Sequence, residues 1–347
     1  PSEDGLRHYA LRSPNVTQLL GTREEIETEL LRPRQLEPPY VAAAFRSAYR
    51  GQNASVNPAK RNPLTAQQEE EFRQARNGVF LIAGSLVTGL EDLSSFLECG
   101  FSPYFSDVKR GSQFPDFQKK LSDLPNKDHE GNTLLFAGPE CSWTEEWIQA
   151  AIEKVNRLKS HRKFIQVVFT ADPARLWDLL AGSSILEHVN LISLSPWHES
   201  MLRRWLDDCG YQTTPEDCRL IAQVTGSWPG LLLEFHKHTH MNAHTWKQNL
   251  LELEKELQQP ATAARWVSHF SIPPEPWRVL KIMADLNESA TIEDLTALLD
   301  EESSEAHVER VMEWGQILSY VARTPGGGQY RLDSLLQTLL NASDHLG

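Results

Sequence analysis

A hydrophobic run that ends at two spaced glycines constrains the fold of this chain more than any other feature. Residues 78–83 read Gly-Val-Phe-Leu-Ile-Ala, and Gly84 and Gly89 follow with four residues between them. An amphipathic segment at 90–97 comes next. A strand, a glycine-bounded turn and a helix in this order are typical of a loop whose backbone N–H groups bind phosphate. Two glycines at this spacing also follow strands by chance, so both interpretations stay open here.

The residues after the second glycine lack the side chains that phosphate chemistry needs. A working Walker A loop has a Lys that reaches the β- and γ-phosphates, followed by a Ser or Thr that holds magnesium. This chain has Leu90 and Glu91 in those places. Glu91 would set a carboxylate where the phosphate charge has to lie. We therefore interpret Gly84, Gly89, Leu90 and Glu91 as a degenerate P-loop, and we expect no cofactor.

Apolar strands alternate with helical segments through the first half of the chain. This alternation predicts parallel pairing with helices that cover the sheet, which is an α/β fold class. The expected strands are 79–83, 133–137, 164–170 and 189–194, and the expected helices are 91–98, 144–158 and 173–180.

The chain becomes helical after residue 195. We expect four helices at 199–209, 215–224, 228–240 and 246–257, and then shorter units at 275–286, 291–299, 305–314, 317–323 and 330–332. Three helices followed by two short strands around a glycine turn is the order of a winged helix.

Two further segments are irregular in sequence. Residues 32–64 are rich in proline, and Thr65 is expected to cap a helix that ends at Arg76. Residues 100–132 place aromatics among Pro, Ser and Lys, which predicts a long docked surface loop. The expected domains are a helical and proline-rich segment at 1–77, a degenerate P-loop-like α/β domain at 78–195, a helical lid at 196–265 and a winged-helix domain at 266–347.

Composition limits the classes of partner. The chain has 347 residues, 40% hydrophobic and 23% charged, with a net charge of −13. Such a charge argues against nucleic-acid binding, because that affinity comes mainly from neutralised phosphates. No apolar run approaches the ~20 residues that span a bilayer. We expect a cytoplasmic protein with a protein partner and no membrane or nucleic-acid partner. The chain opens on Pro1 rather than Met, so we expect a fragment or processed form.

Four segments carry a resemblance to a known family: 167–173 (Val-Val-Phe-Thr-Ala-Asp-Pro), 191–198 (Leu-Ile-Ser-Leu-Ser-Pro-Trp-His), 202–206 and 225–233 (Thr-Gly-Ser-Trp-Pro-Gly-Leu-Leu-Leu). The chain resembles the signal-transduction (STAND) ATPases and the related archaeal-type AAA+ ATPases over residues 79–345. The resemblance implies a sensor-like Thr170 with Asp172 after it, and a lid motif of Thr225, Gly226 and Pro229.

The chain also departs from that family. Ser227 replaces the usual second glycine of the lid motif, and Glu140 alone remains of the acidic pair that the family has at the end of its Walker B strand. With the Walker A Lys and hydroxyl also missing, the family's nucleotide chemistry does not carry over, and we predict no catalytic residue.

Several residues also have a purely structural interpretation. Asp172, followed by Pro173, is a carboxylate at the end of a strand, but we favour a helix cap. The histidines at 236, 238, 240 and 244 crowd one helix end, and the pairs 236/240 and 240/244 have a spacing that suits a metal, but we favour a solvated helix end and no metal site. Tryptophans 197, 205 and 228 are expected to pack the lid against the core.

The sequence therefore favours a non-catalytic regulatory or sensor module that binds a protein, in a bacterial signalling or defence assembly. One alternative is an NTPase whose active P-loop lies upstream of Pro1. Another is a winged-helix DNA-binding transcriptional regulator, but the segment expected to read DNA holds Glu309 and Glu313 against a single Arg310.

Overall fold

A computed structural model describes residues 63–75, 77–100, 107–111, 113–124, 132–137, 141–158, 165–241, 245–299, 304–325 and 327–343. The chain divides into two compact units, Pro1–Ser47 and Ala48–Gly347, and all described residues belong to the second. The predicted domain boundaries near residues 78, 196 and 266 fall inside this second unit and stay predictions. The helices and proline-rich stretch expected before residue 63 lie outside the described residues.

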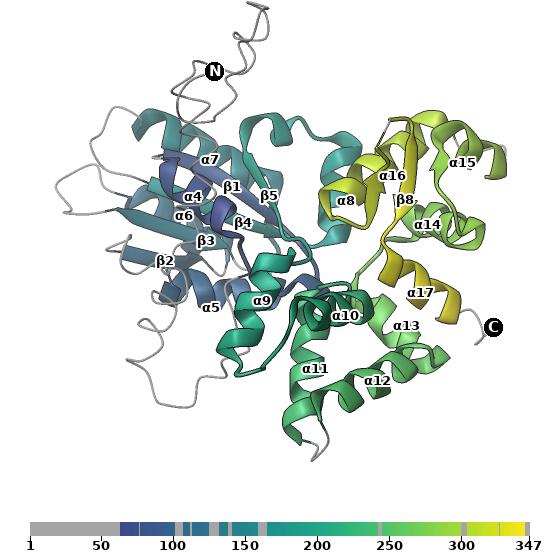
Figure 1. The fold of residues 1–347 in the computed structure, drawn as a ribbon. Coiled ribbons are helices and arrows are strands. Elements are labelled where there is room, and N and C mark those ends of the chain that lie inside the picture. Colours follow the sequence, from purple (N-terminus) through teal and green to yellow (C-terminus); the bar gives the residue numbers. More distant parts are fainter. Residues whose placement is uncertain are drawn as a thin grey trace, which may run out of the picture. The chain divides into compact units, whose positions relative to one another are not determined.

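A parallel β-sheet forms the first half of this unit (Figure 1). The strands lie in the order β2-β3-β4-β1-β5, and every neighbouring pair is parallel. The α/β fold class predicted from the sequence is therefore confirmed. The strands are β1 (Asn77–Ala83), β2 (Asp107–Gly111), β3 (Thr133–Ala137), β4 (Ile165–Ala171) and β5 (Asn190–Ser193).

The inner strands are apolar because helices cover both faces of the sheet. All residues of β3 and β4 are buried, and in the register Leu81 of β1 lies opposite Phe169 of β4. The helices α6 (Phe114–Ser122), α7 (Glu145–Leu158) and α8 (Pro173–Gly182) contribute to the apolar cluster that includes Leu81 and Phe169. On the other face, α4 (Ala66–Gln74) packs Phe72 against Phe80, with ring centroids 4.6 Å apart. Thr65 caps α4 as predicted.

The segment at 100–132 was wrongly predicted to be an irregular loop. It contains the edge strand β2 and the helix α6, and Phe117 of α6 is fully buried. Phe117 stacks on Trp147 of α7 at 4.9 Å. The aromatic residues of this segment therefore belong in part to the core, while 101–106 and 125–131 lie outside the described residues.

A group of helices follows the sheet, here called the lid helices. They bury three tryptophans, Trp197, Trp205 and Trp228, as the sequence predicted. The fifth helix was missed, and the predicted boundary at 265 falls inside it. The helices are α9 (Glu199–Asp208), α10 (Pro215–Thr225), α11 (Pro229–Met241), α12 (Trp246–Leu257) and α13 (Pro260–His269).

The C-terminal part has the predicted order of helices followed by a short hairpin. Its three-stranded antiparallel sheet has the order β6-β8-β7. The third helix runs three residues beyond its predicted end, and the next strand starts only at Val321. The elements are α14 (Pro274–Leu286), β6 (Ala290–Thr291), α15 (Ile292–Leu298), α16 (Glu305–Ile317), β7 (Val321–Arg323), β8 (Gln329–Leu332) and α17 (Ser334–Ser343). Its assignment to the winged-helix class stays a prediction.

One apolar cluster joins residues from the sheet, the lid helices and the C-terminal part. It includes Val87 and Trp177 from the α/β part, Trp228 from the lid region, and Trp314 and Tyr320 from the C-terminal part. Among the described residues, no helix combines the length and the apolar character that crossing a lipid bilayer requires.

Candidate functional site

The turn between β1 and α5 (Leu90–Gly100) is the place where a phosphate loop would lie. It follows the central strand β1, whose neighbours are β4 and β5. Connections leave β1 and β4 toward opposite edges of the sheet, and ligands of open α/β folds bind at such a switch point. The turn contains a short 3₁₀ helix, η1 (Leu86–Thr88), and Gly89 has φ 81°, a left-handed conformation that glycine adopts without strain.

The backbone donors of this turn are used inside the protein. The Gly84 N–H donates to the Ala171 carbonyl at 3.0 Å, and the Ser85 N–H donates to Thr88 Oγ1 at 2.8 Å. The N–H groups of Thr88 and Leu90 both donate to the Ser85 carbonyl, at 3.1 and 3.2 Å. The Gly89 N–H donates to the Leu86 carbonyl at 3.2 Å. A phosphate needs several such amides facing it. These five N–H groups already donate hydrogen bonds to acceptors within the turn or in β4.

The two residues in the lysine and hydroxyl positions differ in exposure. Leu90 is buried, whereas Glu91 is exposed. Glu91 and Asp92 form the first turn of α5, so two carboxylates lie at the positive end of the helix. Acidic residues there stabilise the helix through its dipole, and they repel a bound phosphate.

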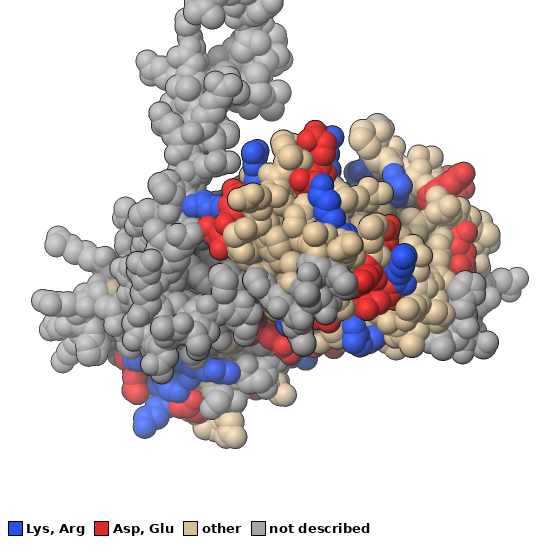
Figure 2. All heavy atoms as spheres, turned by 60° about the horizontal axis from the view of Figure 1, so that its bottom comes forward, with Lys and Arg blue, Asp and Glu red and all other residues tan. Residues whose placement is uncertain are grey.

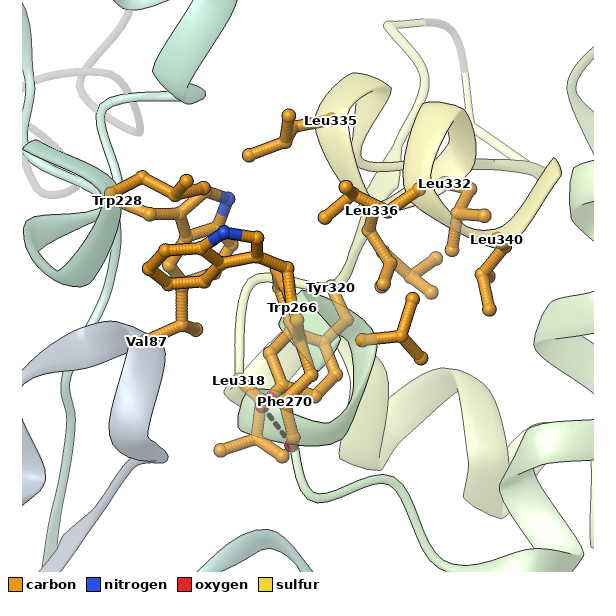
Figure 3. Close-up of a cluster of buried hydrophobic side chains, with 14 of the residues drawn as sticks. Val87, Trp228, Trp266, Phe270, Leu318, Tyr320, Leu332, Leu335, Leu336 and Leu340 are labelled. Carbon is orange, nitrogen blue, oxygen red and sulfur yellow. Dashed lines mark hydrogen bonds between the residues drawn. The ribbon is translucent and has the colours of Figure 1, made fainter. Parts of the chain in front are cut away.

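The start of α11 packs directly on the turn. A Cβ added to Gly230 would lie 3.2 Å from both Cα and O of Val87, so a larger residue here would require the Val87 backbone to move by a few tenths of an ångström. Pro229 approaches the turn too, since a Cβ on Gly89 would lie 3.9 Å from its Cβ. Val87 is fully buried in the apolar cluster that includes Trp228 (Figure 3). Protein atoms thus cover the turn at Val87.

The predicted lid motif builds this contact. Thr225 Oγ1 donates to the Ile221 carbonyl at 2.7 Å and accepts the Ser227 N–H at 3.2 Å. Gly226 ends α10 with φ 60°, and Ser227, which replaces the usual glycine, has φ 57°. The Ser227 carbonyl accepts the Trp197 N–H at 2.9 Å. The motif residues therefore shape the chain reversal that leads into Pro229.

The side chains of Thr170 and Asp172 make their hydrogen bonds to residues outside the turn. Thr170 is buried at the end of β4, and its Oγ1 donates to the Ala137 carbonyl of β3 at 3.2 Å. Asp172 caps α8 by accepting the Arg175 N–H at 2.8 Å, as the capping interpretation predicted. The sensor-like roles stay predictions.

A tryptophan that the sequence did not single out lies against the end of β4. Trp143 is buried, and its Nε1 donates to the Thr170 carbonyl at 2.8 Å. The Arg175 guanidinium lies 4.6 Å from the Trp143 ring centre and donates to the Trp143 carbonyl at 2.6 Å. This arginine is held against Trp143. Glu140, the remaining candidate acid, lies outside the described residues.

The histidine cluster was partly misjudged as a solvated helix end. His236 is buried on α11, and its Nδ1 is 3.0 Å from the Tyr211 hydroxyl. Burial raises the pKa of Tyr211 to about 12. In the part of the chain that the structure describes, no group of three or more His, Cys, Asp or Glu residues is arranged for a metal ion. His240 and His244 have no described side chains.

Comparisons with known proteins give only distant likenesses. No family model matches the chain, and no curated protein matches it in sequence. A Walker-type ATPase of Pyrococcus abyssi is similar in structure, with TM-score 0.49 and 11% identity, over 79% of this chain and 93% of that one. The ORC2 protein of Aeropyrum pernix has TM-score 0.42 and 12% identity over 87% and 98%. The RuvB branch migration motor of Thermotoga maritima has TM-score 0.34 and 16% identity over 80% and 90%.

The fold is evident in the sheet itself. A central strand ends in a Gly84–Gly89 turn, a helix follows, and the neighbouring strands are parallel. The chain thus has a P-loop NTPase-like fold whose phosphate turn is closed by its own hydrogen bonds.

Proposed function

We propose that this protein is a non-catalytic regulatory or sensor module that binds a protein partner and does not use a nucleotide. One observation carries the proposal: the start of α11 lies against Val87, on a turn whose amides are already hydrogen-bonded. A nucleotide would have to displace Pro229 and Gly230 and break the bonds within the turn before any phosphate contact formed.

Charge supports the same conclusion. Glu91 is exposed in the first turn of α5, where the family that the sequence resembles has its metal-binding hydroxyl. At about 4 Å and an effective dielectric constant of 20, two like charges repel by about 4 kcal/mol. Leu90, in the lysine position, is buried and offers no compensating cation.

The C-terminal part supports a protein partner over duplex DNA. Its third helix, α16, exposes Glu305, Glu309 and Glu313, which lie one turn apart on one face. Trp314, on the opposite side, is fully buried, and its Nε1 donates to the Pro173 carbonyl of α8 at 2.9 Å. A helix that reads DNA needs cations toward phosphate, whereas this one exposes carboxylates and packs against the α/β part. Figure 2 shows acidic and basic side chains interspersed on one face of the molecule.

The proposed setting is a cytoplasmic bacterial signalling or defence assembly, and the motif resemblance to signal-transduction ATPases is its support. The test is affinity purification of the full chain from its host, once with MgATP and once after enzymatic removal of nucleotide. We expect the same stoichiometric partner in both samples. Loss of the partner without nucleotide, or turnover of ATP by the purified chain, would contradict the proposal.

A further inference from the structure

Tyr320 lies where the lid helices and the C-terminal part meet. Its side chain is fully buried, and its hydroxyl donates to the carbonyl of Phe270, the residue that ends α13, at 2.7 Å. Its ring centroid lies 5.2 Å from that of Phe270, 5.3 Å from that of Trp314 on α16 and 6.0 Å from that of Trp228 before α11. Figure 3 shows Tyr320, Phe270 and Trp228 within one cluster.

The same tyrosine is linked to the closed turn through Trp228. The Trp228 ring lies 6.0 Å from the Tyr320 ring, and Trp228 belongs to the same apolar cluster as Val87 of the turn. Pro229 and Gly230, which follow Trp228, pack on the turn. The turn therefore meets the lid at Val87 and Gly230, and Trp228 joins this contact to Tyr320 of the C-terminal part.

Two further hydrogen bonds join the C-terminal part to the α/β part. Trp314 Nε1 donates to the Pro173 carbonyl, and Ser193 Oγ at the end of β5 donates to the Ile317 carbonyl. A fifth contact links the lid to α17, since Trp228 Nε1 donates to Asp333 Oδ1 at 3.3 Å. All five contacts bring the parts together around the closed turn.

We propose that Val87, Trp228, Phe270 and Tyr320 form a latch that holds the lid helices and the C-terminal part on the turn without a nucleotide. The inference rests on the proposed function, because it takes the turn to bind no phosphate. Buried groups that share partners are energetically coupled. A substitution that weakens the latch in any one part should therefore speed amide hydrogen exchange in all three parts together. Exchange in the centre of the sheet should stay as slow as in the wild type.

The test is native-state amide hydrogen exchange on the full chain, read in peptides that cover 84–93, 226–235, 318–324 and, as reference, 165–171. Tyr320→Phe removes only the hydroxyl that bonds Phe270, and Gly230→Ala pushes a methyl group against the Val87 backbone. The matched controls are Tyr330→Phe, in the buried side of β8, and Gly182→Ala, where an added Cβ meets nothing within 4 Å.

For Tyr320→Phe we expect exchange about fivefold faster in 84–93, 226–235 and 318–324 together, since one buried hydrogen bond contributes ~1 kcal/mol. Gly230→Ala should give the same pattern, and the controls should leave all four peptides unchanged. Acceleration confined to the mutated segment would overturn the latch, and so would equal acceleration in 165–171. A wild-type sample with MgATP tests the proposed function separately: slower exchange in 84–93 would show nucleotide binding, whatever the variants do.

Discussion

Replacing Phe117 by alanine tests whether α6 belongs to the core. The Phe117 ring is fully buried, lies 4.9 Å from the Trp147 ring and 5.4 Å from the Phe169 ring, and packs tightly against Gly111, where an added Cβ would lie 2.8 Å from it. A buried Phe→Ala change costs about 3–5 kcal/mol. Because Phe117 also loses two aromatic contacts, we expect a cost in the upper half of that range.

Phe169 and Phe114 provide the matched comparison. Phe169→Ala in the fully buried strand β4 should cost about 3–5 kcal/mol as well. Phe114 is only half-buried and keeps one ring contact, at 5.3 Å from Trp147, so Phe114→Ala should cost about 1 kcal/mol.

Chemical denaturation followed by tryptophan fluorescence, with thermal melting as a second probe, measures these differences. In a unit of this size each kcal/mol lowers the Tm by about 2–4 °C, so Phe117→Ala should lower it by ~8–20 °C and Phe169→Ala by ~6–20 °C. The placement of α6 in the core would be refuted if Phe117→Ala lowered the Tm as little as Phe114→Ala does, while Phe169→Ala lowered it by the full expected amount.

Two further predictions concern the C-terminal part. Asp333 keeps some exposed surface, but its partial burial raises the pKa of its carboxyl group. Hydrogen bonds from Trp228 Nε1 and the Leu336 N–H offset only part of that rise. The free energy of unfolding of the wild type should therefore fall as the pH rises from ~4 through the raised pKa. Asp333→Asn, which stays neutral, should flatten this loss in urea unfolding at several pH values, and an unchanged slope would contradict the assignment. Arg323 and Arg331 are exposed on the hairpin, and we expect no gel shift of duplex DNA at low salt. Sub-micromolar binding that weakens steeply between ~50 and ~200 mM salt, and is lost with both arginines changed to alanine, would contradict the protein-partner proposal.

Three of the four parallel strands that the sequence predicted have continuous apolar runs. Such runs arise because parallel strands are buried on both faces, and β1, β3 and β4 have that environment. The edge strand β2, Asp-Val-Lys-Arg-Gly, pairs only with β3 in the described sheet. Edge strands commonly carry charged residues, so β2 has no apolar run that a sequence pattern could detect.

The missed helix α13 has a different cause. Pro260 was taken as a stop signal for the helix before it, whereas it occupies the first turn of α13. Proline is favoured at that position because its missing N–H is not needed there. A proline that follows a helix can thus both end one helix and begin the next.

Only part of the candidate site could be predicted from the sequence. Leu90 and Glu91 are adjacent to the second glycine, so their lack of phosphate chemistry could be read directly. The contact between Val87 and Gly230, and the burial of His236 beside Tyr211, depend on how distant segments pack. Both Leu86 and Val87 between the two glycines are apolar, but only Val87 is buried, so the sequence does not show which of them faces the protein interior.

Isothermal titration of the full chain with MgATP tests the central claim most directly. We expect no saturable heat up to about 1 mM nucleotide, a limit that corresponds to binding weaker than ~4 kcal/mol. The matched variant Leu90→Lys with Glu91→Thr restores the missing side chains, and it should also fail to bind, because the turn amides and Val87 remain committed. Micromolar binding by the wild type would contradict the claim that the turn is closed to phosphate.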